Sequence, residues 1–261
     1  MKLRPVCYEY DGTFEGFLTC VFFSYADRED PVCFLSPGDG RTTLWPARRV
    51  DTQRDKAGRV FRSIRPKMGR EAEELICRAF LTCLPDREVH LCRFLRYGYR
   101  RGAAAVHDLG DPRVHILWKA VRHLNEEAHL LTGFTRFSDF EGVLMGEIEP
   151  KNRVLPLLRR HFAGRYNTEQ FLLFDRVHRE ALVHRPGSWA IVPVDELTLP
   201  PPGADELRYR QLWRRFYDTV AIEGRYNPKL RMTHMPKRYW NTMTEFQTDD
   251  GGRRKLPEGR D

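Results

Sequence analysis

The chain has 261 residues, enough for one large domain or two small ones. Its hydrophobic fraction of 41% and aromatic fraction of 12% are sufficient for a buried core, so a largely disordered chain is not expected. The formal net charge of +8 favours a polyanionic partner such as DNA or RNA, but most of the positive charge is arginine, which a GC-rich genome would also produce.

Sequence features of secreted, membrane and cofactor-binding proteins are missing. The N-terminus has no long apolar segment typical of a signal peptide, and no run of about 18 apolar residues predicts a transmembrane helix. None of the six cysteines forms a Cys-x-x-Cys pair or the three-cysteine motif of a radical-SAM cluster, and most lie in apolar stretches. We therefore expect buried free thiols, a reducing cytoplasm, no membrane association, no cofactor and no metal ion.

The first quarter of the chain, residues 1–65, predicts an α/β segment. Residues 6–10 are typical of a short strand. Residues 14–29 carry apolar side chains at helical spacing, so they predict a helix that ends before Pro31. Residues 32–62 alternate turn residues with short β-like runs.

Residues 66–131 predict a helical segment. Apolar residues recur every three or four positions from Pro66 onward, and Pro85 separates a first helix from a second. Asp111 and Pro112 are typical of the start of a third helix, with the aspartate as N-cap and the proline in the first turn.

Residues 132–246 predict an antiparallel α+β segment with C-terminal helices. From Gly133 the apolar period changes to two, which indicates a pair of strands. A short helix is expected at 153–162, and further strands at 171–175, 181–185 and 189–194.

The helix expected at 204–224 is amphipathic. Residues 247–261 predict a disordered tail. Because helices and strands are segregated along the chain, we expect an α+β fold in which a helical subdomain packs against an antiparallel sheet, in one compact domain. The apolar side of the 204–224 helix carries Tyr209, Trp213, Phe216 and Val220, and its polar side carries Arg208, Gln211 and Arg215.

Three charged residues form a loose nuclease-like pattern. The motifs of P-loop NTPases, α/β-hydrolases, Rossmann enzymes and HExxH zinc proteases are absent. Asp139, Glu149 and Lys151 instead resemble a site in which two carboxylates hold Mg²⁺ and a lysine helps to activate water. The alternative is a strand edge with solvated charges. His161 is a further catalytic candidate, as a general acid or base.

A basic, aromatic-rich segment at 225–240 is the strongest chemical signal. It combines cations for phosphates with flat rings for bases, which is the composition of a nucleic-acid surface. The alternative is that the rings pack against the sheet and the cations are solvated. The candidate contact residues are Arg225, Lys229, Arg231, Lys237, Arg238, Tyr239 and Trp240.

Two residues of the 153–165 stretch predict an anion site. His161 and Arg165 lie one helical turn apart, and together with Arg136 they would hold a phosphate or a flipped nucleotide. Asp175 and Arg179 are expected to brace that site. The alternative is an ion pair of Asp175 that only ties the helix to the sheet.

Several separated motifs resemble a bacterial family of uncharacterised proteins assigned to DNA metabolism or DNA repair. The motifs span about residues 6–246 and include YDGTFEGFLTCVF, GFTRF, FLLFDRVHR and RYNPKL. The shared domain of that family also occurs fused behind a uracil-DNA-glycosylase-like module, and its standalone form is usually encoded beside a radical-SAM protein. The resemblance implies a DNA-repair setting and a radical-SAM partner, but no reaction or cofactor. The motifs contain Arg136, His161, Arg165, Asp175, Arg179, Arg225 and Asn227.

Three hypotheses remain open at this point. The first is a DNA-binding accessory protein for DNA repair or modification that works with a radical-SAM enzyme. It would bind DNA through the candidate cations and rings, together with Asn227. The second is an enzyme on DNA, either a metal-dependent nuclease or a base-modifying activity. The third is a protein-interaction module without affinity for DNA.

Overall fold

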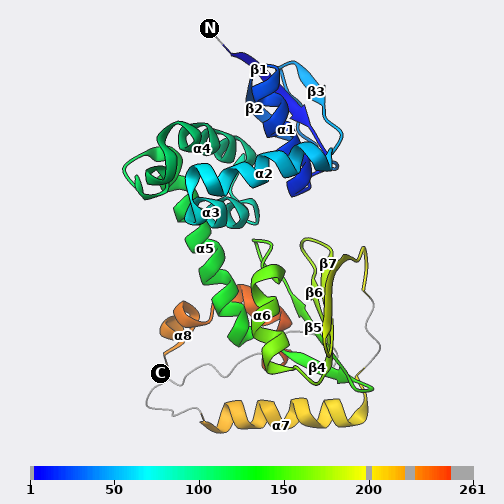
Figure 1. Cartoon of the computed structure of the whole chain (residues 1–261). Coiled ribbons are helices and arrows are strands. Elements are labelled where there is room, and N and C mark those ends of the chain that lie inside the picture. The colour runs from blue at the N-terminus through cyan, green and yellow to red at the C-terminus, as the bar shows by residue number, and fades with distance from the viewer. Residues whose placement is uncertain (1–2, 198–201, 221–226, 248–261) are drawn as a thin grey trace. The chain divides into compact units, whose positions relative to one another are not determined.

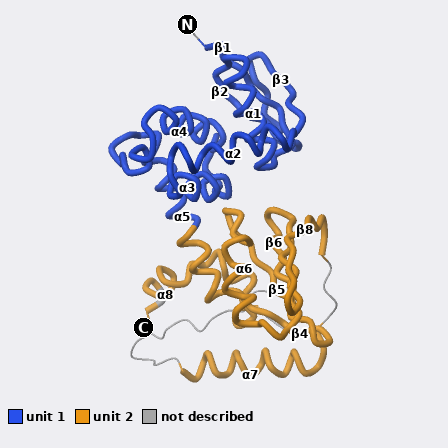
Figure 2. Tube along the Cα trace, viewed as in Figure 1, with its two compact units in different colours: residues 1–124 blue, residues 125–261 orange. Residues whose placement is uncertain are grey.

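In the computed structural model, which describes residues 3–197, 202–220 and 227–247, the chain divides into two units within a single helix. Unit 1 comprises residues 1–124 and unit 2 comprises residues 125–261 (Figure 2). The helix that contains the boundary is α5 (Pro112–Phe134). The predicted α+β class is confirmed, because each unit combines a β-sheet with helices.

Unit 1 begins with a parallel β-α-β arrangement (Figure 1). Strand β1 (Arg4–Glu9) lies between β2 (Glu29–Leu35) and β3 (Ala47–Arg49) and pairs in parallel with both. Helix α1 (Phe14–Ala26) connects β1 to β2. The Thr13 hydroxyl caps this helix by accepting a hydrogen bond from the backbone N–H of Gly16 at 3.0 Å.

Pro31 lies in a strand, and it is not the residue that ends the preceding helix. The helix expected over 14–29 ends at Ala26, and Pro31 belongs to β2. Strand β2 is at the edge of its sheet, where a missing N–H is tolerated. The register between β1 and β2 also shifts at Val6, the residue opposite Pro31, so the ladder is irregular at this point.

Helices α2 (Arg54–Met68), α3 (Arg70–Phe80) and α4 (Arg87–Arg101) follow, and a 3₁₀ turn, η1 (Gly102–His107), leads to α5. The β-like runs expected up to residue 62 are wrong from residue 54 onward, because these residues form α2. Pro66 lies in the last turn of α2, where only one hydrogen bond near the helix end is lost. Fully buried side chains from α1, α2, α4 and α5 form one core; they include Phe17, Ile64, Phe94 and Leu117.

Unit 2 is built on a five-stranded sheet with the order β4-β5-β6-β7-β8. Neighbouring strands are antiparallel except β5 and β6, which are parallel because helix α6 (Leu155–Arg165) returns the chain between them. The Phe162 ring of α6 contacts Phe137 and Phe171, so α6 covers one face of the sheet. The strands are β4 (Phe137–Phe140), β5 (Val143–Ile148), β6 (Gln170–Asp175), β7 (Glu180–Arg185) and β8 (Ser188–Pro193).

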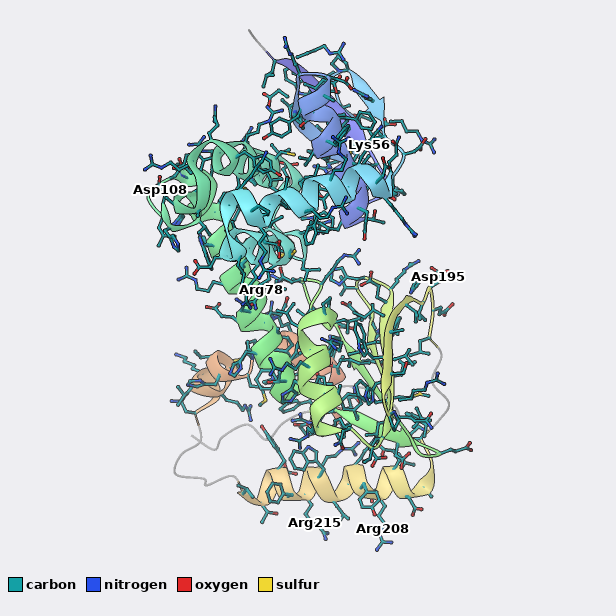
Figure 3. All side chains as sticks on the ribbon, viewed as in Figure 1. Lys56, Arg78, Asp108, Asp195, Arg208 and Arg215 are labelled. Carbon is teal, nitrogen blue, oxygen red and sulfur yellow. The ribbon has the colours of Figure 1, made fainter. Side chains whose placement is uncertain are left out.

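Helix α7 (Ala204–Val220) has no buried residue. Its polar side is as predicted, because Arg208 and Arg215 extend away from the sheet (Figure 3). Helix α8 (Pro228–His234) and two 3₁₀ turns, η3 (Lys237–Thr242) and η4 (Thr244–Phe246), complete the described part of unit 2. The expected tail lies outside the described residues except for Gln247.

The described helices are all too short or too polar to cross a membrane. The six cysteines are free thiols, but the expected burial holds for only three of them, Cys7, Cys20 and Cys92. Cys33 and Cys77 are half-buried, and Cys83 is exposed.

Candidate nucleic-acid interface

A cleft of about 790 Å³ opens in unit 2 beside helix α7. Its walls come from the end of α5, from β4 and β5, from the end of α6 and from α7 (Figure 1). Because these elements are distant in sequence, the cleft forms only when unit 2 folds. The rings in its walls are Phe137, Phe162, Tyr166, Tyr209, Trp213 and Phe216, and its arginines are Arg136, Arg165 and Arg210.

Two polar side chains fix the first half of α7 to strand β4. The Glu206 carboxylate accepts a hydrogen bond from the backbone N–H of Asp139 at 3.2 Å, and Arg210 donates to the Ser138 hydroxyl at 2.6 Å and to Glu206 at 2.7 Å. Burial alone would raise the pKa of Glu206, but hydrogen bonds from Arg210 and Ser138 outweigh burial and hold that pKa below its usual value. Glu206 and Arg210 therefore anchor α7.

Residues of η4 hold the second half of α7. The Tyr217 ring meets the Phe246 ring edge-on, with centroids 5.6 Å apart, and Arg214 Nε donates to the backbone carbonyl of Thr244 at 3.3 Å. With both halves anchored, the apolar side of α7 stays open along the cleft.

The two arginines predicted for an anion site line this same cleft but differ in availability. Arg136 donates to the buried Glu245 carboxylate at 2.7 and 3.2 Å, and its guanidinium lies 5.7 Å from the Trp213 ring centroid. Arg165 is exposed, lies 5.8 Å from the Tyr166 ring centroid, and takes part in none of the ion pairs between described residues. Arg136 is therefore a structural cation, whereas Arg165 is available to an anionic ligand.

Aromatic rings on α7 are displayed to solvent along the cleft. Trp213 and Phe216 stack on one another with centroids 5.5 Å apart, yet they remain 40% and 54% exposed. Tyr209, one turn before Trp213, is 69% exposed. Large rings exposed together in a cleft indicate a binding surface, and their flat faces suit a nucleobase. The sequence predicted these residues as one side of a helix but gave no sign that they would remain uncovered.

His161 lies outside this arrangement. It is exposed on α6, its ring meets Phe162 edge-on at 4.9 Å, and it does not line the cleft. His161 and Arg165 are one turn apart on α6, as expected, but only Arg165 reaches the cleft. The predicted group of His161, Arg165 and Arg136 is therefore corrected to two arginines, one of them already paired with a carboxylate.

The two rings of η3 are packed against other rings. Tyr239 is 2% exposed and contacts the Phe134 ring at 5.4 Å, and its burial raises its pKa. Trp240 stacks on Phe246 at 4.6 Å, and its indole N–H donates to the carbonyl of Met235 at 3.0 Å. Base stacking by Tyr239 is thus excluded, since its ring has no free face. Trp240 has one face covered by Phe246.

The cations of the basic segment have different surroundings. The guanidinium of Arg231 lies 5.4 Å and the ammonium of Lys237 lies 5.9 Å from the Trp240 ring centroid. Lys229 is exposed on α8, and the Asn227 side chain caps α8 by accepting from the backbone N–H of Leu230 at 2.9 Å. These contacts give Asn227 a structural role and leave Lys229 open to solvent.

Arg238 is tied to α5. One of its guanidinium nitrogens lies 3.3 Å from the carboxylate of Glu127, which is buried and also accepts from the backbone N–H of Asn152 at 2.8 Å. None of the described residues of 227–240 lines the cleft, and Arg225 and Tyr226 lie outside the described residues. The basic segment and the Arg165 cleft are therefore separate, so the single composite site considered from sequence is not formed by the residues described.

The sheet register separates the two carboxylates of the nuclease-like pattern. Asp139 is paired with Leu144, and Glu149 lies five positions further along the chain, about 17 Å away at the rise of a strand. One Mg²⁺ ion holds its ligands at about 2 Å, so the two carboxylates cannot share it. Glu149 forms an ion pair with Arg176 at 3.2 Å, and Lys151 is exposed. No group of three or more His, Cys, Asp and Glu side chains within the described ranges is placed to hold a metal ion.

Asp175 braces the turn between β6 and β7. It is fully buried, accepts from the backbone N–H groups of Val177 and His178 at 3.0 Å each, and lies 2.7 Å from His178 Nδ1. Arg179 is exposed at the end of this turn with φ 54°. The partner of the Asp175 side chain is thus His178, and this pair shapes a turn outside the cleft.

Comparison with known proteins identifies one family model. The model of DUF4130, a domain of unknown function, matches residues 85–245, which include every residue of the cleft. No curated protein matches the chain. A solved structure of the pGpG-specific phosphodiesterase PggH from Vibrio cholerae is similar over 79% of this chain and 88% of its own, with 12% identity and a TM-score of 0.35. A likeness at that level carries no argument about function.

Proposed function

The chain belongs to the DUF4130 family, and we propose that it is a nucleic-acid-binding accessory protein that takes unstacked bases of a DNA strand into the cleft of unit 2. The observation that carries this proposal is the presence, in one cleft, of exposed rings on α7 and an arginine without a carboxylate partner among the described residues.

The chemistry of the cleft fits a single strand better than a duplex. Stacking of a base on an aromatic ring contributes about 1–3 kcal/mol and requires a base whose faces are free. The exposed rings of Trp213 and Phe216 are available for stacking with a base, and Arg165 supplies a cation for the neighbouring phosphate. Arg208 and Arg215, on the outer side of α7 (Figure 3), add a positive field that attracts the strand from a distance.

An accessory role is favoured over catalysis. Among the described residues, Glu206 is the one carboxylate that lines the cleft, and it is occupied by Arg210 and the backbone of Asp139. A general base or metal ligand at this position would have to give up the anchor of α7. We therefore infer that chemistry on the bound strand is supplied by a partner. The sequence resemblance suggests a radical-SAM enzyme of DNA repair or modification for this role.

The test is the fluorescence anisotropy of a labelled DNA strand of about 20 nucleotides, titrated with protein at several salt concentrations. Arg165→Ala is expected to weaken binding about tenfold or more, because one charge-assisted contact is lost. It should also reduce the slope of log K against log salt by about 0.7, since one phosphate contact fewer is made. Trp213→Ala is expected to weaken binding about tenfold and leave the slope unchanged.

Matched controls are available on the same sheet. Arg185→Ala removes an arginine at the end of β7 that is exposed like Arg165, and Trp189→Ala removes an exposed ring on β8; neither residue lines the cleft. Both variants should bind the strand as the wild type does. Absent or salt-independent binding by the wild type, or an equal loss in the control variants, would contradict the proposal.

A protein-interaction module is a second candidate, which one observation favours. Leu212, Phe216 and Val220 are 52%, 54% and 59% exposed along α7, and a run of exposed apolar side chains on one helix is typical of a surface that meets another protein. This candidate predicts co-purification with a partner that is lost in Leu212→Asp. It also predicts no affinity for the DNA strand in the anisotropy titration.

A further inference from the structure

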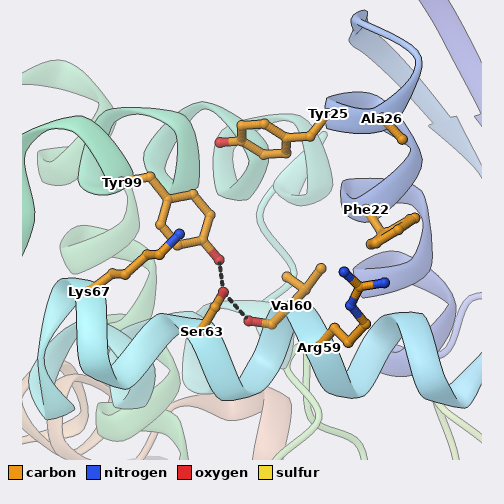
Figure 4. Close-up of a pocket in the computed structure, with 8 residues that line it drawn as sticks. All are labelled: Phe22, Tyr25, Ala26, Arg59, Val60, Ser63, Lys67 and Tyr99. Atoms are coloured by element: carbon orange, nitrogen blue, oxygen red, sulfur yellow. Dashed lines mark hydrogen bonds between the residues drawn. The ribbon is translucent and has the colours of Figure 1, made fainter.

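A second pocket, of about 470 Å³, lies in unit 1 between α1, α2 and α4 (Figure 4). Seven of its eight lining residues precede residue 85, so it lies almost entirely outside the stretch that matches DUF4130. Its volume is in the range typical of small-molecule sites. No carboxylate lines it.

Helix α2 supplies two cations along one edge of the pocket. Arg59, Ser63 and Lys67 follow one another at intervals of four residues, which places them on the same side of the helix. Arg59 and Lys67 are therefore about 12 Å apart along the helix axis, with Ser63 between them. Both cations are exposed, and neither takes part in an ion pair with a described residue.

Each of these cations lies beside an aromatic ring. The Arg59 guanidinium is 5.2 Å from the Phe22 ring centroid, and the Lys67 ammonium is 5.2 Å from the Tyr99 ring centroid. The Tyr25 ring, which is 47% exposed, meets Tyr99 edge-on at 5.9 Å. Figure 4 shows these rings around the pocket, with the two cations at opposite ends.

The polar groups of the pocket have a defined hydrogen-bond direction. Ser63 Oγ donates to the backbone carbonyl of Val60 at 2.7 Å, so the hydroxyl of Tyr99, 2.8 Å away, must donate to Ser63 Oγ. The Tyr99 oxygen is thereby left as an acceptor. Burial raises the pKa of Tyr99, so the hydroxyl keeps its proton at neutral pH.

We propose that this pocket binds a nucleoside phosphate, with its phosphate held by Arg59 or Lys67 and its base against the rings of Phe22, Tyr25 and Tyr99. Cations without carboxylate partners suit a phosphate, and the exposed Tyr25 ring beside the half-buried rings of Phe22 and Tyr99 suits a base. A ligand that joins both groups uses the whole pocket. A free nucleotide and the phosphorylated end of a strand share this chemistry. The proposal does not depend on the cleft of unit 2.

The test is isothermal titration calorimetry of the full chain with AMP, adenosine and inorganic phosphate. AMP is expected to bind at least tenfold more tightly than either fragment, because it alone engages both a cation and the rings. The double variant Arg59→Ala/Lys67→Ala should weaken AMP binding about tenfold or more, and the single variant that loses the phosphate-holding cation should account for most of that loss. Lys67→Arg keeps the charge and should bind AMP as the wild type does. Competition by a 5′-phosphorylated oligonucleotide, but not by its 5′-hydroxyl form, would assign the site to a strand end. Absence of such competition would assign it to free nucleotides.

The matched control is Arg65→Ala, which removes an exposed arginine of the same helix that does not line the pocket. It should bind AMP as the wild type does, and circular dichroism melting curves should show that all variants remain folded. The proposal is overturned by no detectable AMP binding at millimolar concentration, by phosphate binding as tight as that of AMP, or by an equal loss in Arg65→Ala.

Discussion

Replacing Glu29 by glutamine is expected to destabilise unit 1 by about 2–4 kcal/mol. Glu29 is fully buried at the start of β2, and its carboxylate accepts from the Tyr8 hydroxyl at 2.6 Å and from Arg48 at 2.8 Å, as well as from Arg4. Tyr8 is also fully buried, so its bond to a charged acceptor contributes about 1.5–3 kcal/mol. Arg4 is largely exposed and contributes little.

Urea unfolding followed by circular dichroism measures this loss. With a slope of about 2–3 kcal/mol per molar urea, the midpoint of Glu29→Gln should fall by about 1 M. Tyr8→Phe removes the hydrogen bond that Glu29→Gln weakens by neutralising its acceptor, so the double variant should lose less than the sum of the two single variants. The matched control is Glu9→Gln, at an exposed position of the adjacent strand β1. A Glu29→Gln midpoint within error of that control, or strictly additive losses, would refute the reasoning.

The same carboxylate predicts a pH dependence. Burial alone would raise the pKa of Glu29, but hydrogen bonds from Tyr8 and Arg4 and the charge of Arg48 hold it below its usual value. A folded-state pKa below the unfolded value means that the stabilisation is complete above the unfolded pKa of about 4.3 and is lost as the pH falls through the lower folded value. Stability of the wild type should therefore decline more steeply with acid than that of Glu29→Gln.

Two further predictions concern thiols and glycines. Among the cysteines, the exposed Cys83 should react first with a thiol reagent. Cys92 should react only on unfolding, because burial raises the pKa of its thiol well above the usual value. Mass spectrometry of the modified protein measures the order of reaction. Gly98→Ala should lower stability by about 1–3 kcal/mol, since the new Cβ would lie 2.0 Å from the Met68 side chain. Gly164→Ala on α6 meets nothing within 4 Å and should be neutral or stabilising in the same melting assay; a loss equal to that of Gly98→Ala would contradict this account.

Local periodicity accounts for the elements that were predicted correctly. The strands near 171–175, 181–185 and 189–194 and the short helix before them are confirmed, because each is a run of one period between clear turn signals. Proline positions misled the prediction in two places. Pro31 is tolerated at a sheet edge and Pro66 in the last turn of a helix, and neither context is visible before the fold is known.

The residues of the candidate site could be predicted only in part from the sequence, for a similar reason. Residue chemistry selected Arg136 and Arg165, which share a cleft, but could not reveal that Glu245 occupies the first of them from 109 positions away. Composition likewise treated Tyr239 as a ring for bases, whereas packing against Phe134 buries it. Exposure decided both outcomes, and exposure depends on contacts between distant parts of the chain.

The family match begins at residue 85, whereas unit 1 extends to residue 124, so the family boundary passes through a hydrophobic core. Helix α4, with the buried Phe94 and Leu95, lies on the matched side of that boundary, and the residues of α1 and α2 that belong to the same core lie on the other. A gene fragment limited to the matched residues would encode a helix with a bare apolar side and a tendency to aggregate. In this protein, the segment that matches the family model is therefore shorter than the segment whose residues share the hydrophobic core of unit 1.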